Sequence, residues 1–327
     1  MTQIRPSSER TAVTPPAPPA VPGRSERLAR RAHGHAVSLR DAGRRWEARA
    51  PRVIAVLRAV FYPCAIALVT FMGWRAAQDV DLAHIHYVPL VVAFAAALVW
   101  WLALAFGWAA LLDDGRPGRA MSSWCRTQVA RYLPGGIWAV AARATTVQGR
   151  VRDKLTAVTA ENVIVLLVSL AVGGVWATVH DWRWGLLTLL VAAPLLASRW
   201  LERRTRITHR GVRRAAGSYA IGYAAYGILG VLVQIAVSGV HSPTYPLYVA
   251  GASCVAWAAG LVVVFAPGGV GIREVVYVAL LSGLYPRAEL EAGAVTSRLV
   301  TIAAEVTVLA LVAVSRRFRD PAPDTPA

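Results

Sequence analysis

The chain has 327 residues, of which 56% are hydrophobic and 16% are charged, and its mean hydropathy is +0.46. Soluble domains are about 45–50% apolar and about 25% charged, so this composition excludes an ordinary soluble enzyme. The 35 Lys and Arg against 18 Asp and Glu give a net charge of +17, which a nucleic-acid-binding protein would carry on a polar surface. The composition instead predicts an all-α, polytopic membrane protein that carries its charge in its loops and has no nucleic-acid partner.

Eight apolar runs are candidate membrane-spanning helices, for which about 20 mostly apolar residues are needed. In chain order they cover residues 53–72, 87–112, 161–179, 185–198, 218–240, 247–266, 272–285 and 295–314. The fourth and the seventh are shorter than an ordinary span. A transmembrane domain over residues 53–315 is therefore predicted, preceded by a cytoplasmic tail over 1–52 and followed by a short one over 316–327.

The net charge falls on alternate loops of this topology. Segments 1–52, 113–160, 199–217 and 315–327 together carry +19, whereas 73–86, 180–184, 241–246 and 286–294 together carry −2. Charges within the predicted spans cancel. Because cytoplasmic loops carry the excess of Lys and Arg, both termini are predicted to be cytoplasmic and the protein to lie in the plasma membrane.

The predicted cytoplasmic tail has two parts. Residues 11–22 are rich in proline, which favours extended and unfolded chain. Residues 24–52 are rich in arginine with scattered apolar residues, a pattern typical both of a topology anchor and of a helix that lies on anionic lipid. The tail is therefore predicted to be disordered, and both roles of its arginines stay open.

One motif occurs twice, as Pro134, Gly135 and Gly136 and again as Pro267, Gly268 and Gly269. In the predicted topology each copy follows an inward-running helix and precedes an outward-running one, which indicates two four-helix repeats in the same orientation. Proline lacks an N–H and glycine permits unusual backbone angles, so a helix breaks at each copy. Paired breaks of this kind mark binding sites in transporters, although each is also typical of a turn between spans.

Ionisable residues interrupt the apolar runs and flank the two breaks. They are Arg131, Arg143, Glu161, Arg273, Glu274, Arg298 and Glu305. A lone charge is costly in hydrocarbon, so these residues are expected either to line a polar cavity or to form structural ion pairs. Arg298 and Glu305 are seven residues apart, on one helix face but too far apart for a direct pair.

Guanidinium groups match phosphate through paired hydrogen bonds, which makes the interior arginines candidates for binding an anionic head group. We assign this role to Arg143, Arg273 and Arg298. Glu161, Glu274 and Glu305 are expected to orient those arginines or to bind a coupling proton. Arg131 and both Pro-Gly-Gly segments complete the predicted substrate-binding set.

These motifs resemble the flippase-like transmembrane domain of the lysylphosphatidylglycerol synthase family. That family has an Arg/Lys-Tyr-Leu/Ile-Pro-Gly motif, an acidic residue that opens the next span and a late Pro-Gly-Gly-x-Gly-x-x-Glu, matched here by residues 131–136, Glu161 and residues 267–274. The resemblance covers residues 53–315. It implies movement of aminoacylated or glycosylated lipids between leaflets, or a role beside polyprenol-linked glycan assembly. No soluble synthase domain is expected after the last span, so lysyl transfer is not expected.

Two other classes of function stay open. The first outside loop contains Asp79, Asp81, His84 and His86, and paired carboxylates there could bind a divalent ion or act as a base in a membrane glycosyltransferase. The loop is short and shows no set of three or four converging ligands, so neither a metal nor a cofactor is predicted. The other class is a non-catalytic membrane partner of a cell-envelope glycosyltransferase or synthase. The sequence contains neither the glycine-rich motif of an ATP-binding loop nor the nucleophile-elbow motif of hydrolases.

Overall fold

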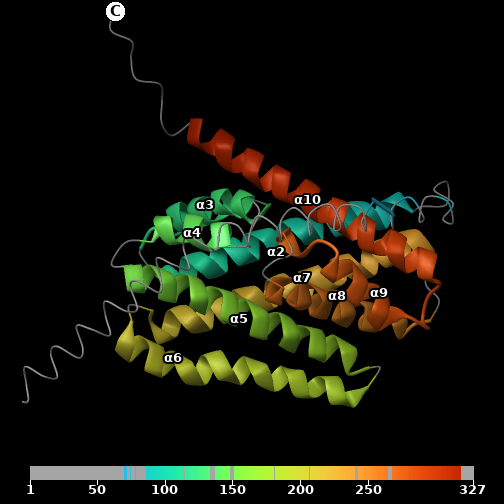
Figure 1. Cartoon of the computed structure of the whole chain (residues 1–327), viewed down its shortest axis with the longest axis horizontal. Coiled ribbons are helices and arrows are strands. Elements are labelled where there is room, and N and C mark those ends of the chain that lie inside the picture. Colours follow the sequence, from blue (N-terminus) through green and yellow to red (C-terminus); the bar gives the residue numbers. More distant parts are fainter. Residues whose placement is uncertain are drawn as a thin grey trace, which may run out of the picture. The chain divides into compact units, whose positions relative to one another are not determined.

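The computed structural model describes residues 86–113, 115–132, 137–147, 151–179, 181–205, 207–239, 242–263 and 267–317, together with Thr70, Phe71, Trp74 and Gln78. The predicted tail over 1–52 and most of the first predicted span and of the outside loop up to residue 85 lie outside this part. Within it the chain forms helices and no named strand, which confirms the all-α prediction (Figure 1).

The helices follow one another with short connections. In chain order they are α2 (Tyr87–Leu112), α3 (Pro117–Thr127), the 3₁₀ helix η2 (Gln128–Tyr132), α4 (Ile137–Thr146), α5 (Val151–Ala177), η3 (Trp182–Val191), α6 (Ala192–Arg204), α7 (His209–Ser238), α8 (Tyr245–Val262), η4 (Pro267–Gly269), α9 (Ile272–Leu281) and α10 (Arg287–Arg317).

Six helical segments among the described residues are long and apolar enough to cross a membrane. They are Tyr87–Leu112, Asp153–Ala177, Trp182–Arg203, His209–Ser238, Tyr245–Val262 and Arg287–Val314. Each overlaps one of the eight predicted spans. The predicted seventh span corresponds to α9, whose ten residues extend about 15 Å, half of the hydrocarbon thickness. A full span there is not confirmed, because the helix begins only after the break at residues 267–271 and ends at Leu281.

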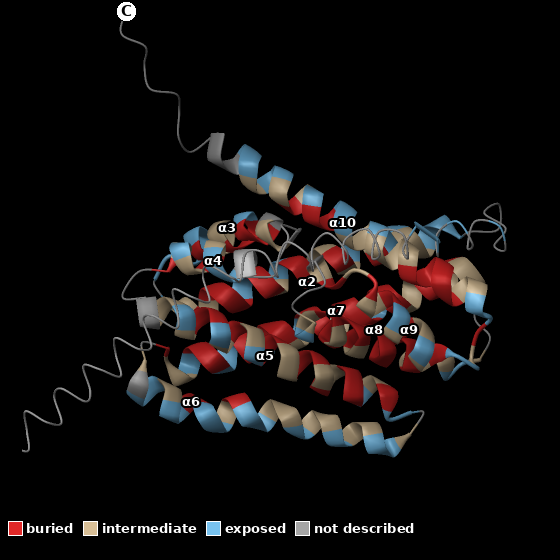
Figure 2. Ribbon diagram, viewed as in Figure 1, coloured by how far each residue is buried: buried red, intermediate tan, exposed pale blue. Residues whose placement is uncertain are grey.

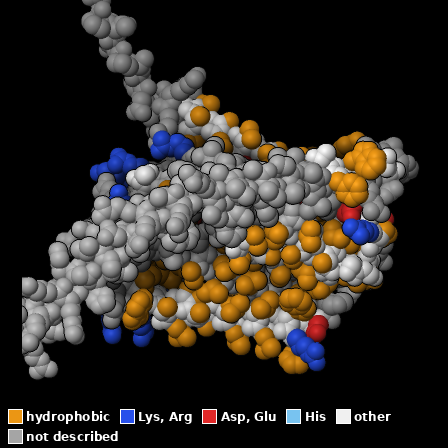
Figure 3. Space-filling view, in the orientation of Figure 1, with side chains coloured by type: hydrophobic (Ala, Val, Ile, Leu, Met, Phe, Trp, Pro, Cys, Tyr) orange, Lys and Arg blue, Asp and Glu red, His pale blue; other side chains and the backbone are white. Residues whose placement is uncertain are grey.

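The longest helices run between two ends of one body. At one end the backbone N–H of His86 donates to the carbonyl of Ala236, so the start of α2 meets the end of α7. At the other end the Thr208 hydroxyl donates to Asp113, so the end of α2 meets the start of α7. Basic side chains gather at this second end, called here the basic end, and Figure 3 shows them beside a broad hydrophobic face over α5 and α6.

The two Pro-Gly-Gly breaks are approached from opposite ends. The first hairpin, made of α3, η2 and α4, begins at the basic end after α2, and the second hairpin, made of α8, η4 and α9, begins at the other end. Their tips meet, since η2 contacts η4. The same order of elements, a long helix followed by a hairpin and another long helix, thus occurs twice, as α2 to α5 and as α7 to α10. The second copy runs in the opposite direction to the first. This arrangement contradicts the predicted repeat in one orientation.

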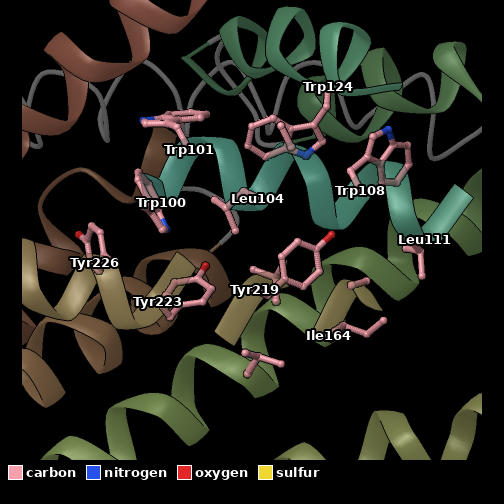
Figure 4. Packing of buried hydrophobic residues seen from close by; sticks show 14 of the residues in the cluster. Trp100, Trp101, Leu104, Trp108, Leu111, Trp124, Ile164, Tyr219, Tyr223 and Tyr226 are labelled. Carbon is pink, nitrogen blue, oxygen red and sulfur yellow. The ribbon is translucent and has the colours of Figure 1, made fainter. Parts of the chain in front are cut away.

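Aromatic side chains fill the space between α2 and α7, the most closely packed pair of helices. Trp100, Trp108, Tyr219 and Tyr223 are at most 1% exposed, and Figure 4 shows the tryptophans along α2 with the tyrosines on the opposite side. Gly107 lets the Tyr219 ring approach the α2 backbone, since a side chain there would meet the ring. Buried residues concentrate along α2, α7 and α8, whereas η3 has no buried residue and α6 is mostly exposed (Figure 2). The site described next therefore rests on a closely packed centre.

Candidate functional site

The first hairpin carries a fully buried ion pair. Nη1 of Arg143 on α4 lies 2.6 Å from both carboxylate oxygens of Glu161 on α5, and the indole N–H of Trp124 on α3 donates to the same carboxylate at 2.6 Å. The Arg143 guanidinium also stacks over the rings of Trp108 and Trp124. Both charged residues are less than 10% exposed. This cluster ties three helices together and neutralises both charges.

A second ion pair joins the tip of the first hairpin to the last helix. Nη2 of Arg131 lies 2.6 Å from a carboxylate oxygen of Glu305 on α10. The guanidinium of Arg131 lies 4.8 Å from the ring of Trp101, near the middle of α2. The tip of this hairpin therefore reaches the middle of the body, although its arginines belong to a segment predicted as a cytoplasmic loop.

The second hairpin holds its own carboxylate. One oxygen of Glu274 accepts the backbone N–H of Gly271 at 2.7 Å, which caps the start of α9, and the other lies 3.6 Å from Nη1 of Arg298. Arg298 also donates to the carbonyl of Gly268 at 3.1 Å. Gly268, Gly269 and Gly271 all have positive φ, which a residue with a side chain rarely adopts. The break is thus a specific backbone conformation that Arg298 and Glu274 stabilise.

Arg273 is the fourth arginine of the interior, and it forms no salt bridge with any described carboxylate. Its guanidinium lies 5.0 Å from the ring of Trp257 on α8, and its Nε is buried without a hydrogen-bond partner. A Cβ at Gly260 or Gly269 would approach the Arg273 side chain to 2.5 or 2.7 Å. Two glycines and one indole therefore define where this arginine lies.

A cavity of about 450 Å³ lies between the two hairpins and α5. Its lining is mostly apolar but includes three arginines and Glu161, and for these charged groups it is called here the polar cavity. It brings together six of the predicted site residues, namely Arg131, Arg143, Glu161, Gly268, Gly269 and Arg273. Glu305 lies behind Arg131. Glu274 and Arg298 instead line a space of about 30 Å³ on the other side of Arg273, large enough for one water molecule. Pro134, Gly135 and Gly136 lie outside the described residues, and Pro267 opens η4.

An apolar groove of about 650 Å³ adjoins the polar cavity. It lies between α5, α6 and the start of α7, within the hydrophobic face seen in Figure 3. Its lining is almost entirely apolar, with Ile164, Pro194 and Leu201 among its residues. Thr159 and Val163 on α5 line both spaces. A space that holds charged groups among apolar residues thus adjoins an almost entirely apolar one along a single turn of α5.

Several residues of the site have no evident signal in the sequence. The indoles of Trp101, Trp124 and Trp257 contact Arg131, Arg143 and Arg273 respectively. Tryptophan in an apolar run is an ordinary core residue, so only the spatial proximity of an arginine distinguishes these three. Gly260 lies in the last turn of α8, where a glycine is common, so it gave no sign of a close contact either.

No family model and no curated protein matches the chain. Of the candidate glycosyltransferase residues only His86 is described, and its backbone N–H bonds to Ala236. Asp79, Asp81 and His84 lie outside the described residues. Within the part of the chain that the structure describes, no group of three or more His, Cys, Asp or Glu could hold a metal ion.

Proposed function

We propose that the protein binds a membrane lipid with an anionic head group, such as an anionic phospholipid, a glycolipid or a polyprenyl-phosphate-linked lipid, and moves it between leaflets. The observation that carries this proposal is the junction at Thr159 and Val163, where the polar cavity meets the apolar groove. A lipid is the ligand class that needs both environments at once. The proposal agrees with the resemblance to the flippase-like family.

The size and chemistry of the two spaces support this assignment. A small-molecule pocket typically encloses about 300–1,000 Å³, and the polar cavity falls in this range. Arg131, Arg143 and Arg273 give it hydrogen-bond donors for an anion. The groove offers an acyl or prenyl chain an apolar surface that opens toward the hydrocarbon, so the head group would enter sideways from the bilayer.

The hairpins offer a route for exchange between the two sides. One hairpin enters from the basic end, which the positive-inside rule makes cytoplasmic, and the other enters from the opposite end. Irregular backbone at membrane depth is tolerated where protein buries it or where it lines a cavity. Displacement of one tip from the other would open the polar cavity toward one side. The Arg131–Glu305 pair holds the first tip in the described state.

A block at the junction tests this function. The full-length protein is reconstituted into liposomes with fluorescent phosphatidylglycerol, and dithionite quenching measures how fast lipid leaves the inner leaflet. Val163→Trp places a large ring at a residue that lines both spaces, where it would obstruct a lipid that occupies the two together, so we expect a marked fall in movement. Leu196→Trp places the same ring on an exposed position of α6 outside both spaces and is expected to leave the rate unchanged.

Two results would contradict the proposal. One is equal rates in Val163→Trp, Leu196→Trp and the unaltered protein, and the other is no movement of any lipid in a panel that includes polyprenyl phosphates. The glycosyltransferase alternative is separated by Asp79→Asn with Asp81→Asn, which should abolish activity in a sugar-transfer enzyme and leave lipid movement intact here. Co-purification with an envelope enzyme, without lipid movement, would favour a scaffold.

A further inference from the structure

Arg273 distinguishes itself from the other interior arginines by its surroundings. Arg131, Arg143 and Arg298 lie 2.6, 2.6 and 3.6 Å from Glu305, Glu161 and Glu274, whereas Arg273 faces the Trp257 ring and the open polar cavity. Among the described interior residues, one positive charge therefore stays without a carboxylate. An uncompensated charge at membrane depth is costly, so a ligand that neutralises it would bind there.

On the basis of the proposed function, we propose that Arg273 recognises the ligand, and that the ligand head group is a phosphodiester with one net negative charge and no cationic group. One guanidinium balances one phosphodiester, which it can hold through two hydrogen bonds. The Trp257 ring and the two glycines fix the plane of the guanidinium before the ligand arrives.

The glutamates of the site exclude a cationic head group. Glu161 already accepts from Trp124 and Arg143, Glu274 accepts from Gly271 and faces Arg298, and Glu305 pairs with Arg131. Of these three carboxylates only Glu161 lines the polar cavity, and Arg143 already neutralises it, so an ammonium group of a zwitterionic or aminoacylated lipid would find no free counter-charge there. Burial of an unpaired charge disfavours such a head group.

Gly260 offers a way to displace Arg273 without removing its charge. A Cβ at position 260 would lie 2.5 Å from Cγ and 2.6 Å from Nε of Arg273, so the flexible side chain must move off the indole. Gly217 on α7 is the matched control, because a Cβ there has no atom within 4 Å. Gly260→Ala should therefore weaken ligand binding, and Gly217→Ala should not.

The test is native mass spectrometry of the full-length protein in detergent, titrated separately with phosphatidylglycerol, phosphatidylcholine and the deacylated diester glycerophosphoglycerol. We expect phosphatidylglycerol to bind more tightly than the other two. Arg273→Gln should weaken that binding about 10- to 100-fold, the range of hydrogen bonds to charged groups. Arg273→Lys and Gly260→Ala should show intermediate losses, and the exposed Arg183→Gln none. Thermal unfolding in the same detergent confirms that each variant is folded.

Unchanged phosphatidylglycerol binding in folded Arg273→Gln or Gly260→Ala would overturn the role of Arg273. Equally tight binding of phosphatidylcholine would overturn the exclusion of cationic groups. Equal affinity for glycerophosphoglycerol would assign the site to a water-soluble phosphodiester and overturn the lipid as its ligand. Binding that depends on Arg273 without movement in liposomes would support this inference and refute translocation, whereas movement that is independent of Arg273 would do the reverse.

Discussion

The two hairpins carry similar residues but use them differently. In the first hairpin the two interior arginines, Arg143 and Arg131, lie 2.6 Å from Glu161 of α5 and 2.6 Å from Glu305 of α10. In the second hairpin the carboxylate of Glu274 caps its own helix, and Arg273 has no carboxylate. Carboxylates thus neutralise the interior arginines of the first hairpin, whereas Arg273 of the second hairpin forms no salt bridge with a described carboxylate. Arg131 and Arg143 thus stabilise the fold, whereas Arg273 is the candidate for binding a ligand.

The largest expected effect on stability is that of a substitution at Glu161. Glu161→Gln leaves the buried Arg143 without its counter-charge, and breaking a buried pair in this way costs about 3–5 kcal/mol. We expect a marked loss of thermal stability in detergent. Size-exclusion chromatography after heating measures this loss as the fraction of protein that remains unaggregated. The exposed Glu202→Gln on α6 is the control. The double variant Arg143→Met with Glu161→Met removes both charges and should recover most of the loss. A Glu161→Gln protein as stable as Glu202→Gln would show that this cluster does not anchor the hairpin.

A smaller effect is expected at Glu274 in the second hairpin. Glu274→Gln keeps an oxygen that can accept the Gly271 N–H, and it removes a charge that is 3.6 Å from Arg298. Arg298 retains its bond to the Gly268 carbonyl, so the loss should be about 1–2 kcal/mol. The same heating experiment measures it. A loss of stability in Glu274→Gln greater than that in Glu161→Gln would show that the second hairpin, not the first, is the more strongly anchored of the two.

The sequence predicts the helices better than it predicts their partners. Hydropathy located six spans, because about 20 apolar residues are a strong local signal. Charge counting could not reveal that residues 117–146 turn back into the body, since α3 and α4 are short and carry arginines that the pattern assigns to a loop. The partners of these arginines are distant along the chain: Glu305 is 174 residues from Arg131.

The prediction for Arg298 and Glu305 shows the same limit. Their spacing of seven residues correctly excludes a direct pair, and both lie on α10. Each instead pairs with a different hairpin, Arg298 with Glu274 and Glu305 with Arg131. Helical periodicity places a side chain on a face but does not tell which hairpin tip reaches that face. The special position of Arg273 is likewise invisible in the sequence, because it depends on Gly260 and Trp257 of another helix.

The central claim is that one lipid places its head group in the polar cavity and a chain in the apolar groove. Photo-crosslinking measures this most directly, with phosphatidylglycerol that carries a diazirine on its acyl chain, reconstituted with the full-length protein. We predict crosslinks on α5 and α6 at groove residues such as Leu155, Ala197 and Leu201, and their loss in Val163→Trp. Crosslinks spread evenly over the exposed faces of α2 and α10, unaffected by Val163→Trp, would contradict the account.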